Sequence, residues 1–272
     1  MRVTEPFHKF FADRGTHLAA MVAYFALLSF VPLTFLALAL LGVAGQPDES
    51  SYLVRELKRA FPDTSVDRIV TAVNAVRRNA AALGIAGAVI LAWTSLSLFS
   101  VLESAFNVVY GRPNRPFLQG KALALVLLAG SLVALFAGLL AGSLGYRVLQ
   151  DLAPGVLAEP YVAYAVSVLV SSIAALAFLI AAYYFLTNTD LTMREVLPGA
   201  LIATLALEVT FQALPLYLRF SQDSIALQAF GGPALLLVWL YVMANVIVFG
   251  AEVNFCRSLR PRVEPVETAE VA

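Results

Sequence analysis

Charged residues and cysteine are both scarce in this sequence. Only 13% of its 272 residues are charged and 60% are hydrophobic, whereas soluble domains contain about 25% charged residues. The single cysteine, Cys256, excludes an intramolecular disulfide and the paired-cysteine spacing of a structural zinc site. We therefore expect a chain that lies mostly in a membrane and needs no cofactor or metal.

An excess of one charge sign is also missing. Eighteen Lys and Arg residues balance eighteen Asp and Glu residues, so the chain lacks the basic surface with which proteins bind nucleic acid. The two histidines, His8 and His17, precede the first apolar run, either as polar residues at a membrane edge or with a proton or metal role. Catalytic motifs are absent from the apolar segments, so we expect neither an enzyme nor a nucleic-acid partner.

Long hydrophobic runs dominate what is present. A spanning helix needs about 20 mostly apolar residues, because about 30 Å of hydrocarbon is crossed at ~1.5 Å per residue. Six segments meet this requirement, at about residues 18–44, 82–109, 121–146, 161–187, 195–217 and 232–256. The sequence therefore predicts an all-α, polytopic membrane protein whose transmembrane domain covers residues 18–256.

Basic residues predict the orientation of these spans. With the N-terminus inside, the termini and short inner connections hold ten Lys and Arg residues, whereas the short outer connections hold only Arg147 and Arg219. The other six basic residues lie in the long first loop, residues 46–80, and long loops have less influence on orientation. We predict that both termini are cytoplasmic.

Three segments outside the spans have distinct patterns. Residues 1–17 carry three phenylalanines together with Lys9 and Arg14, which is typical of an amphipathic segment on the cytoplasmic membrane surface. The outer loop, 46–80, has apolar residues at helical spacing and predicts two short amphipathic helices. The non-periodic end, residues 257–272, predicts a disordered cytoplasmic tail.

Small residues and prolines indicate where helices approach or bend. We expect the third span to pack inside the bundle through a stripe of small residues, with pore lining as the alternative. This stripe consists of Gly130, Ala134, Gly138 and Gly142. Pro32 predicts a bend in the first span, with Ser29 placed to satisfy the freed backbone groups. Pro198 and Gly199 mark a kink or hinge in the fifth span.

Three glutamates lie inside apolar segments, each with an amide side chain on the same helical face. The pairs are Glu103 with Asn107, Glu208 with Gln212, and Asn245 with Glu252, and Asn254 completes a candidate intramembrane polar stripe. A carboxylate beside so much hydrocarbon is costly unless it is paired or wetted.

Two interpretations of these glutamates stay open. Glu103 and Glu252 lie near the cytoplasmic surface, where a basic loop residue such as Arg112, Arg115 or Arg257 could pair with them and close the bundle. They could instead line a pathway. Glu208 lies nearer mid-depth, which favours the pathway interpretation for that residue.

Four stretches carry a resemblance to a known family, in family order and over nearly the whole chain. They are AYFALLSFVPL (23–33), AWTSLSLFSVLESAFNVVYG (92–111), VLPGALIATLALEV (196–209) and WLYVMANVIVFGAEVN (239–254). They resemble the YihY/BrkB family of bacterial inner-membrane proteins. The family's Pro-Gly before the fifth span matches Pro198 and Gly199, and its Gly-Ala-Glu-x-Asn matches residues 250–254. Where the family often has Tyr-Gly-Ser before the last span, this chain has Phe-Gly-Gly at 230–232.

The resemblance implies six transmembrane helices in the bacterial cytoplasmic membrane. Members of this family were once labelled ribonuclease BN, but no cluster of carboxylates and histidines outside the apolar segments and no basic groove supports that activity here. Other members are linked to serum resistance or to envelope lipids.

Together with the polar stripe, this leads us to expect a transporter or translocator of an amphipathic or envelope-lipid-related substrate through an intramembrane polar cavity. The alternative is a non-transporting scaffold or interaction protein of the cell envelope. Membrane lipids are the expected partners, the substrate is not identified, and a homo-oligomer stays open.

Overall fold

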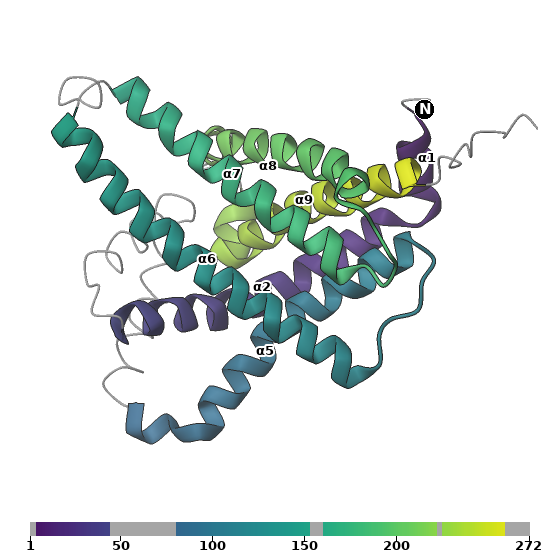
Figure 1. The fold of residues 1–272 in the computed structure, drawn as a ribbon, viewed down its shortest axis with the longest axis horizontal. Coiled ribbons are helices and arrows are strands. Elements are labelled where there is room, and N and C mark those ends of the chain that lie inside the picture. The colour runs from purple at the N-terminus through teal and green to yellow at the C-terminus, as the bar shows by residue number, and fades with distance from the viewer. Residues whose placement is uncertain (1–3, 44–79, 153–159, 222–224, 259–272) are drawn as a thin grey trace, which may run out of the picture.

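The computed structural model describes residues 4–43, 80–152, 160–221 and 225–258, and these residues are helical apart from short connections. The helices are α1 (Glu5–Ala12), α2 (Gly15–Val43), α5 (Ala80–Val109), α6 (Phe117–Leu152), α7 (Pro160–Leu186), α8 (Met193–Ser221) and α9 (Ile225–Ser258) (Figure 1). Each of the six predicted spans falls on one of the long helices. The amphipathic helices predicted in the loop 46–80 and the tail from residue 259 onward lie outside the described residues.

Within the described residues, four helices are long and apolar enough to cross a membrane. The qualifying stretches lie in α6, α7, α8 and α9, at Phe117–Ala134, Val168–Leu186, Met193–Ala213 and Leu236–Ser258. The start of α2, Gly15–Phe30, is a shorter apolar helix. These lengths and compositions suit a multi-pass membrane protein, because each stretch approaches the thickness of the hydrocarbon core.

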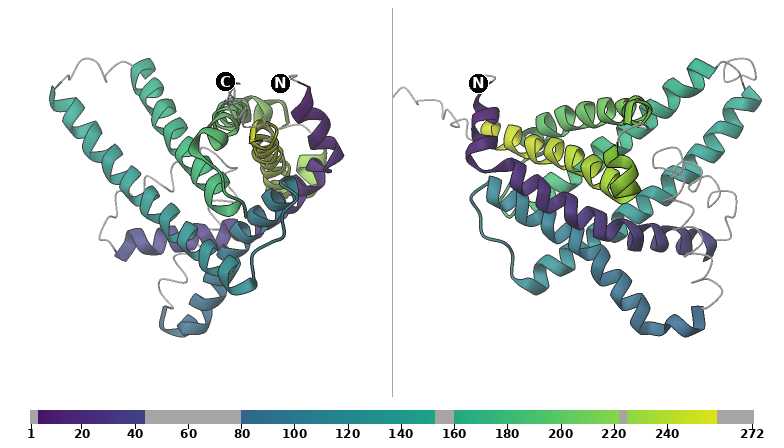
Figure 2. Two further views of the ribbon diagram at one scale, coloured as in Figure 1. Left: turned by 45° about the vertical axis from the view of Figure 1, so that its right-hand side comes forward. Right: turned by 180° about the vertical axis from the view of Figure 1, so that it is seen from behind.

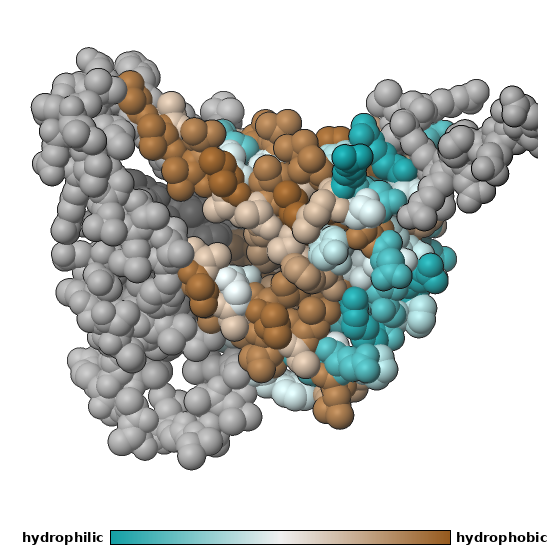
Figure 3. All heavy atoms as spheres, in the orientation of Figure 1, coloured by the Kyte–Doolittle hydropathy of each residue, from teal (hydrophilic) through white to brown (hydrophobic). Residues whose placement is uncertain are grey.

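Apolar side chains also cover the outside of these helices. Val133 of α6, Leu169 of α7, and Leu205 and Val209 of α8 are each at least 60% exposed. In Figure 3 the hydrophobic residues occupy the middle of the visible face, and the hydrophilic residues gather at one end. Such a surface is favourable in lipid, where exposed apolar side chains meet acyl chains rather than water.

Helix α9 lies at the centre of the bundle. It packs along α2 and α8, and α1 and α5 also contact it. Helix α2 runs beside α5, α7 runs beside α8, and α6 lies at the edge against α5 and α7 (Figures 1 and 2). Away from the chain termini, the α6–α7 hairpin and the far ends of α2 and α5 point in different directions (Figure 2).

The opposite end of the bundle is densely packed, and we call it the terminus end. Here α1, the connections 110–116 and 187–192, and the last turns of α9 meet (Figure 1). The main buried cluster includes Phe106, Tyr183 and Leu186, each at most 1% exposed. The rings of Phe106 and Tyr183 have centroids 5.1 Å apart. Because hydrocarbon gives helices little hydrophobic drive to associate, tight contacts and polar bonds must hold this end together.

The N-terminal segment is more deeply integrated than the sequence suggested. Its helix, α1, packs against α9, with Phe10 only 6% exposed and its ring centroid 5.9 Å from that of Phe249. Phe7 also contacts Phe249, with ring centroids 4.7 Å apart, although it is 52% exposed, and Phe11 is 67% exposed. One face of α1 therefore belongs to the bundle, and the other face is free for the membrane surface predicted for this segment.

Two sequence predictions about the spans need correction. Ser29 does not satisfy groups freed by Pro32 within its own helix, because its hydroxyl donates to the Thr94 carbonyl of α5 at 2.8 Å. Gly130 and Ala134 do not pack against the described part of the bundle, since both are exposed and a Cβ on Gly130 would meet nothing within 4 Å. The physical reason is that α6 lies at the edge and buries a different face. The surroundings of Gly138 and Gly142 lie outside the described part of α6.

Candidate functional site

The residues of the predicted polar stripe fall into separate groups. Glu103 and Asn107 lie on α5, and Glu252 and Asn254 lie on α9, all buried at the terminus end. Glu208 and Gln212 lie much further along α8 and are linked by a hydrogen bond of 2.9 Å. Asn245 donates to the Tyr241 carbonyl of its own helix at 2.7 Å. The structure therefore does not join these residues into one continuous path.

Glu103 is held by Arg115, one of the partners that the ion-pair interpretation named. The Arg115 guanidinium lies 3.2 Å from Glu103 Oε1, and the carboxylate side chain is only 5% exposed. The same guanidinium donates to the carbonyls of Leu186 at 2.7 Å and Thr187 at 3.0 Å. These carbonyls end α7, where unpaired acceptors and the helix dipole favour a cation. Arg115 thus ties the α5–α6 connection to both α5 and α7.

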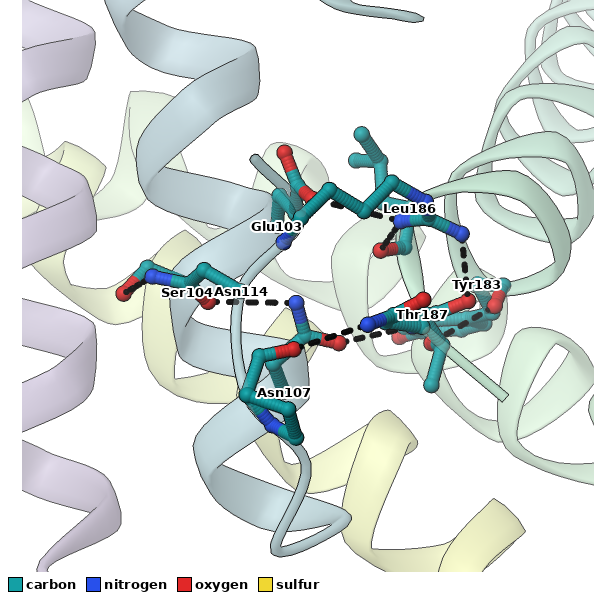
Figure 4. A network of polar contacts seen from close by, with 10 residues as sticks. Glu103, Ser104, Asn107, Asn114, Tyr183, Leu186 and Thr187 are labelled. Carbon is teal, nitrogen blue, oxygen red and sulfur yellow. Dashed lines mark hydrogen bonds and ion pairs between the residues drawn. The ribbon is translucent and has the colours of Figure 1, made fainter. Parts of the chain in front are cut away.

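Asn107 bridges two connections at the same end. Its amide oxygen accepts from the Asn188 backbone N–H at 2.7 Å, and its amide nitrogen donates to Asn114 at 3.1 Å (Figure 4). Asn188 in turn donates to the Pro113 carbonyl at 2.9 Å. Both polar ends of a fully buried amide are therefore satisfied, which is what a structural role requires. These contacts join the α5–α6 and α7–α8 connections.

Glu252 is paired with a residue that the sequence interpretation did not consider. Its carboxylate is 0% exposed and lies 3.0 Å from the Lys9 ammonium of α1. Lys9 also contacts Asp13, donates to the Val109 carbonyl at 2.8 Å and lies 4.1 Å from the Phe255 ring centroid. Lys9 therefore connects α1 to the ends of α5 and α9. An ammonium with this many partners is well placed to hold a buried carboxylate.

Tyr110 lies near Glu252 in the same buried part of the terminus end. Its ring packs edge-on against Phe255, with centroids 5.4 Å apart. Burial raises the pKa of the Tyr110 phenol, and the nearby Glu195 and Glu252 carboxylates raise it further. Among the described residues, its hydroxyl is buried without a hydrogen-bond partner.

Helices α8 and α9 meet through their glycines. The Gly199 N–H donates to the Asn254 amide oxygen at 2.7 Å. A Cβ on Gly199 would overlap the Gly250 carbonyl oxygen, and a Cβ on Gly250 would lie 2.9 Å from Ala203 Cβ. Because Pro198 has no N–H, this part of α8 already lacks one backbone bond, and the bond to Asn254 ties the next residue across to α9. The Pro-Gly motif of α8 and the Gly-Ala-Glu-x-Asn motif of α9 are thus two halves of one helix contact.

The surroundings of Glu208 differ from those of Glu103 and Glu252. Glu208 Oε2 lies 3.4 Å from the Ser171 hydroxyl and 3.3 Å from the Ser172 hydroxyl of α7, and Oε1 accepts from Gln212. Glu208 is partly exposed, and Ser171 and Gln212 are exposed. The ion pairs found among the described residues do not include Glu208. We call Glu208, Gln212, Ser171 and Ser172 the Glu208 cluster.

Only weak sequence signals point to the partners found here. The sequence predicts that Lys9 lies near the lipid headgroups, because an amphipathic segment with a lysine suits a membrane surface. Ser172 has no polar residue on the same face of α7 that would identify it as part of a site. Ser171 fits a stripe of small packing residues as well as it fits a polar site. No group of three or more potential metal-ligating side chains occurs within the described residues.

Comparison with known proteins agrees with the membrane architecture. A profile of the family described as virulence factor BrkB matches residues 7–271. A UPF0761 membrane protein of Azoarcus sp. (strain BH72) is 27% identical over 259 residues, which cover 89% of this chain and 60% of the relative. A UPF0761 membrane protein of Pseudoalteromonas translucida (strain TAC 125) is 26% identical over 250 residues, which cover 90% of this chain and 82% of the relative.

Some relatives differ in length or in name. The chain spans about three fifths of the length of the Azoarcus relative and of one from Verminephrobacter eiseniae (strain EF01-2). A ribonuclease-like protein named YfkH, from Bacillus subtilis (strain 168), is 24% identical over 263 residues, or 92% of each chain. No solved structure matches. Since the family profile covers nearly all of the sequence and four helices are suited to crossing a bilayer, the chain is a multi-pass membrane protein that belongs to the BrkB family.

Proposed function

We propose that this protein translocates an amphipathic, envelope-lipid-related molecule across the bacterial cytoplasmic membrane, and that the Glu208 cluster is the polar site on its route. The observation that carries the proposal is the contrast between the glutamates. Glu103 and Glu252 are buried and ion-paired, whereas Glu208 is partly exposed and is held only by neutral groups.

The depth of Glu208 supports this role. It follows the first residue of α8, Met193, by fifteen positions, which places it ~22 Å along the helix at ~1.5 Å per residue. Such a position lies within the hydrocarbon core, where a charged side chain is costly, up to about 2.5–3.5 kcal/mol at the centre in insertion measurements. A purely structural acid would be expected to find a basic partner there. In a translocator, this carboxylate would contact the polar head group as it moves between the leaflets.

The terminus end supports a route that is closed on one side in this structure. The Lys9–Glu252 and Arg115–Glu103 pairs hold α1 and both short connections over the ends of α5, α7 and α9. A translocator that exposes its site to one side at a time needs such a closed end. In this proposal the two pairs form the cytoplasmic seal, and Glu208 lies beyond it.

Replacing Glu208 with Gln should lower translocation about tenfold or more. A hydrogen bond to a charged group is worth about 1.5–3 kcal/mol, and each 1.4 kcal/mol corresponds to tenfold. Glu208→Gln keeps the shape of the side chain and can still bond to Gln212. The measurement is movement of a fluorescent lipid between leaflets of vesicles that contain the purified full chain.

Glu195→Gln is the matched control on the same helix, because Glu195 lies in the first turn of α8 and bonds only to Thr192. Wild-type movement in both variants would reject the Glu208 cluster as the site. If vesicles with the wild-type protein moved lipid no faster than protein-free vesicles, translocation would be rejected. The scaffold interpretation would then remain.

We further propose that α2 and α5 also cross the membrane, which gives six spans with both termini in the cytoplasm. These helices contain 29 and 30 residues, which correspond to ~43 and ~45 Å and exceed the ~30 Å hydrocarbon core. The gathering of short-loop basic residues at the terminus end supports this orientation.

Labelling of single cysteines tests this topology. In a Cys256→Ser background, a cysteine introduced by Arg112→Cys or Asp190→Cys should react with an impermeant maleimide only after the cells are permeabilised. A cysteine introduced by Ser50→Cys, in the first loop, should react in intact cells. The reverse pattern would overturn the orientation, and reaction at all three positions in intact cells would overturn the proposed number of spans.

A further inference from the structure

We infer that the Glu208 cluster binds a positively charged group, either the amine or ammonium head of the translocated molecule or a monovalent cation. This inference rests on the proposed function for the identity of the site, but binding can be measured without transport. It adds the charge of the ligand, which neither the family nor the fold specifies.

The coordination of Glu208 leaves room for a cation. Its two oxygens offer about four acceptor positions, and two neutral donors approach them, from Gln212 at 2.9 Å and Ser172 at 3.3 Å. The Ser171 hydroxyl lies 3.4 Å away but donates to the Val168 carbonyl of its own helix at 2.9 Å. Neutral donors leave the negative charge uncompensated. The hydroxyl oxygens of Ser171 and Ser172 are also acceptors, so they can face a cation. Hard cations and ammonium groups prefer such oxygen-rich surroundings.

A second buried group beside Glu208 also needs a partner. Thr204 lies four residues before Glu208, on the same face of α8. Its side chain is only 5% exposed, and among the described residues its hydroxyl has no hydrogen-bond partner. A buried hydroxyl normally bonds to protein, to water or to a ligand. An oxygen-lined site next to Glu208 that admits a ligand or its water would satisfy this hydroxyl.

The charges along the two helices favour a cation over an anion. Helix α7 contains no Lys or Arg, and α8 contains none between Arg194 and Arg219. At ~1.5 Å per residue, both arginines are more than ~15 Å along the helix from Glu208, well beyond the reach of a direct contact. On these two helices an anionic head group would therefore meet a carboxylate and no basic residue at this depth. A cation would instead offset the cost of the buried carboxylate.

The chain contains a reporter beside the site. Trp239 of α9 lies against Phe211 of α8, with ring centroids 6.3 Å apart, and Phe211 follows Glu208 by three residues. The other tryptophan, Trp93, lies on α5. In a Trp93→Phe background, quenching of Trp239 by lipids with brominated tails reports binding close to the Glu208 cluster.

The experiment compares three brominated lipids with identical tails and with trimethylammonium, glycerol or phosphoglycerol heads. They are titrated into the purified full chain in neutral detergent. We expect the cationic lipid to quench Trp239 at about tenfold lower concentration than the anionic lipid, which corresponds to ~1.4 kcal/mol. Glu208→Gln should abolish this preference. Glu195→Gln, in the first turn of the same helix and outside the cluster, should retain it, because the Glu208 carboxylate is unchanged.

Replacing N-methylglucamine chloride with sodium chloride at constant ionic strength distinguishes the two sources of positive charge. Displacement of the cationic lipid by sodium would identify a metal cation as an occupant, whereas unchanged quenching would identify the amine head. Equal quenching by all three lipids, or a preference that survives Glu208→Gln, would overturn the inference. Translocation of lipids regardless of head group would overturn it too, while leaving the proposed function intact.

Discussion

Lys9→Met is expected to destabilise the folded protein by about 3–5 kcal/mol. This is the usual cost of removing one partner from a buried ion pair, because the remaining charge stays buried without compensation. Glu252 is 0% exposed and lies 3.0 Å from the Lys9 ammonium. The substitution also removes the bond from Lys9 to the Val109 carbonyl. Methionine keeps most of the apolar stem, so the loss reports the charge rather than the packing.

A double-mutant cycle with Glu252→Gln separates the pair from its surroundings. Lys9→Met combined with Glu252→Gln should recover much of the loss, since neither member is then a buried unpaired charge. Thermal unfolding in detergent measures each variant, and Arg257→Met, at an exposed position in the last turn of α9, is the control. Strictly additive effects, or a Lys9→Met variant as stable as the control, would show that Lys9 is only a surface charge.

Alanine at Gly199 or Gly250 is expected to disrupt the contact between α8 and α9. The new Cβ at Gly199 would overlap the Gly250 carbonyl oxygen, and the new Cβ at Gly250 would overlap the Tyr183 hydroxyl. The Gly250 carbonyl oxygen that obstructs a Cβ on Gly199 is a backbone atom, so it cannot rotate away. Overpacking in a tight core costs about 1–3 kcal/mol and sometimes more, and the Gly199–Asn254 hydrogen bond would be lost in addition.

Gly130→Ala is the matched control for these substitutions. It makes the same chemical change on an exposed face of α6, where a Cβ meets nothing within 4 Å. Alanine favours a helix by about 0.8–1 kcal/mol over glycine, so Gly130→Ala should be neutral or slightly stabilising. Thermal unfolding and the yield of monodisperse protein measure all three variants. The close contact would be refuted if Gly199→Ala and Gly250→Ala behaved like Gly130→Ala.

The helices themselves could be predicted closely. Their apolar segments exceed the length of a bilayer crossing, so composition and length alone placed helices at 82–109 and 161–187 within about two residues of α5 and α7. The partner of Glu103 was also within reach. Arg115 follows Glu103 by twelve residues, across a short connection, so the chain itself brings the two close together.

The partner of Glu252 was beyond prediction for the opposite reason. Lys9 precedes Glu252 by 243 residues, and nothing in an amphipathic N-terminal segment indicates that its lysine points into the bundle rather than toward lipid. The exposure of Gly130 and Ala134 was beyond prediction for a related reason. The spacing shows that one face of α6 carries small residues. Only the position of α6 at the edge of the bundle shows that Gly130 and Ala134 face outward.

The sequence by itself determined that this chain forms long helices suited to hydrocarbon, because the solvent imposes that requirement on each segment separately. Only the tertiary structure decided which acidic groups are neutralised and which is left open. Neutralisation depends on contacts between distant segments, such as Lys9 with Glu252, and these contacts arise only when the helices assemble. For that reason one polar stripe in the sequence became an ion-paired terminus end and a separate Glu208 cluster.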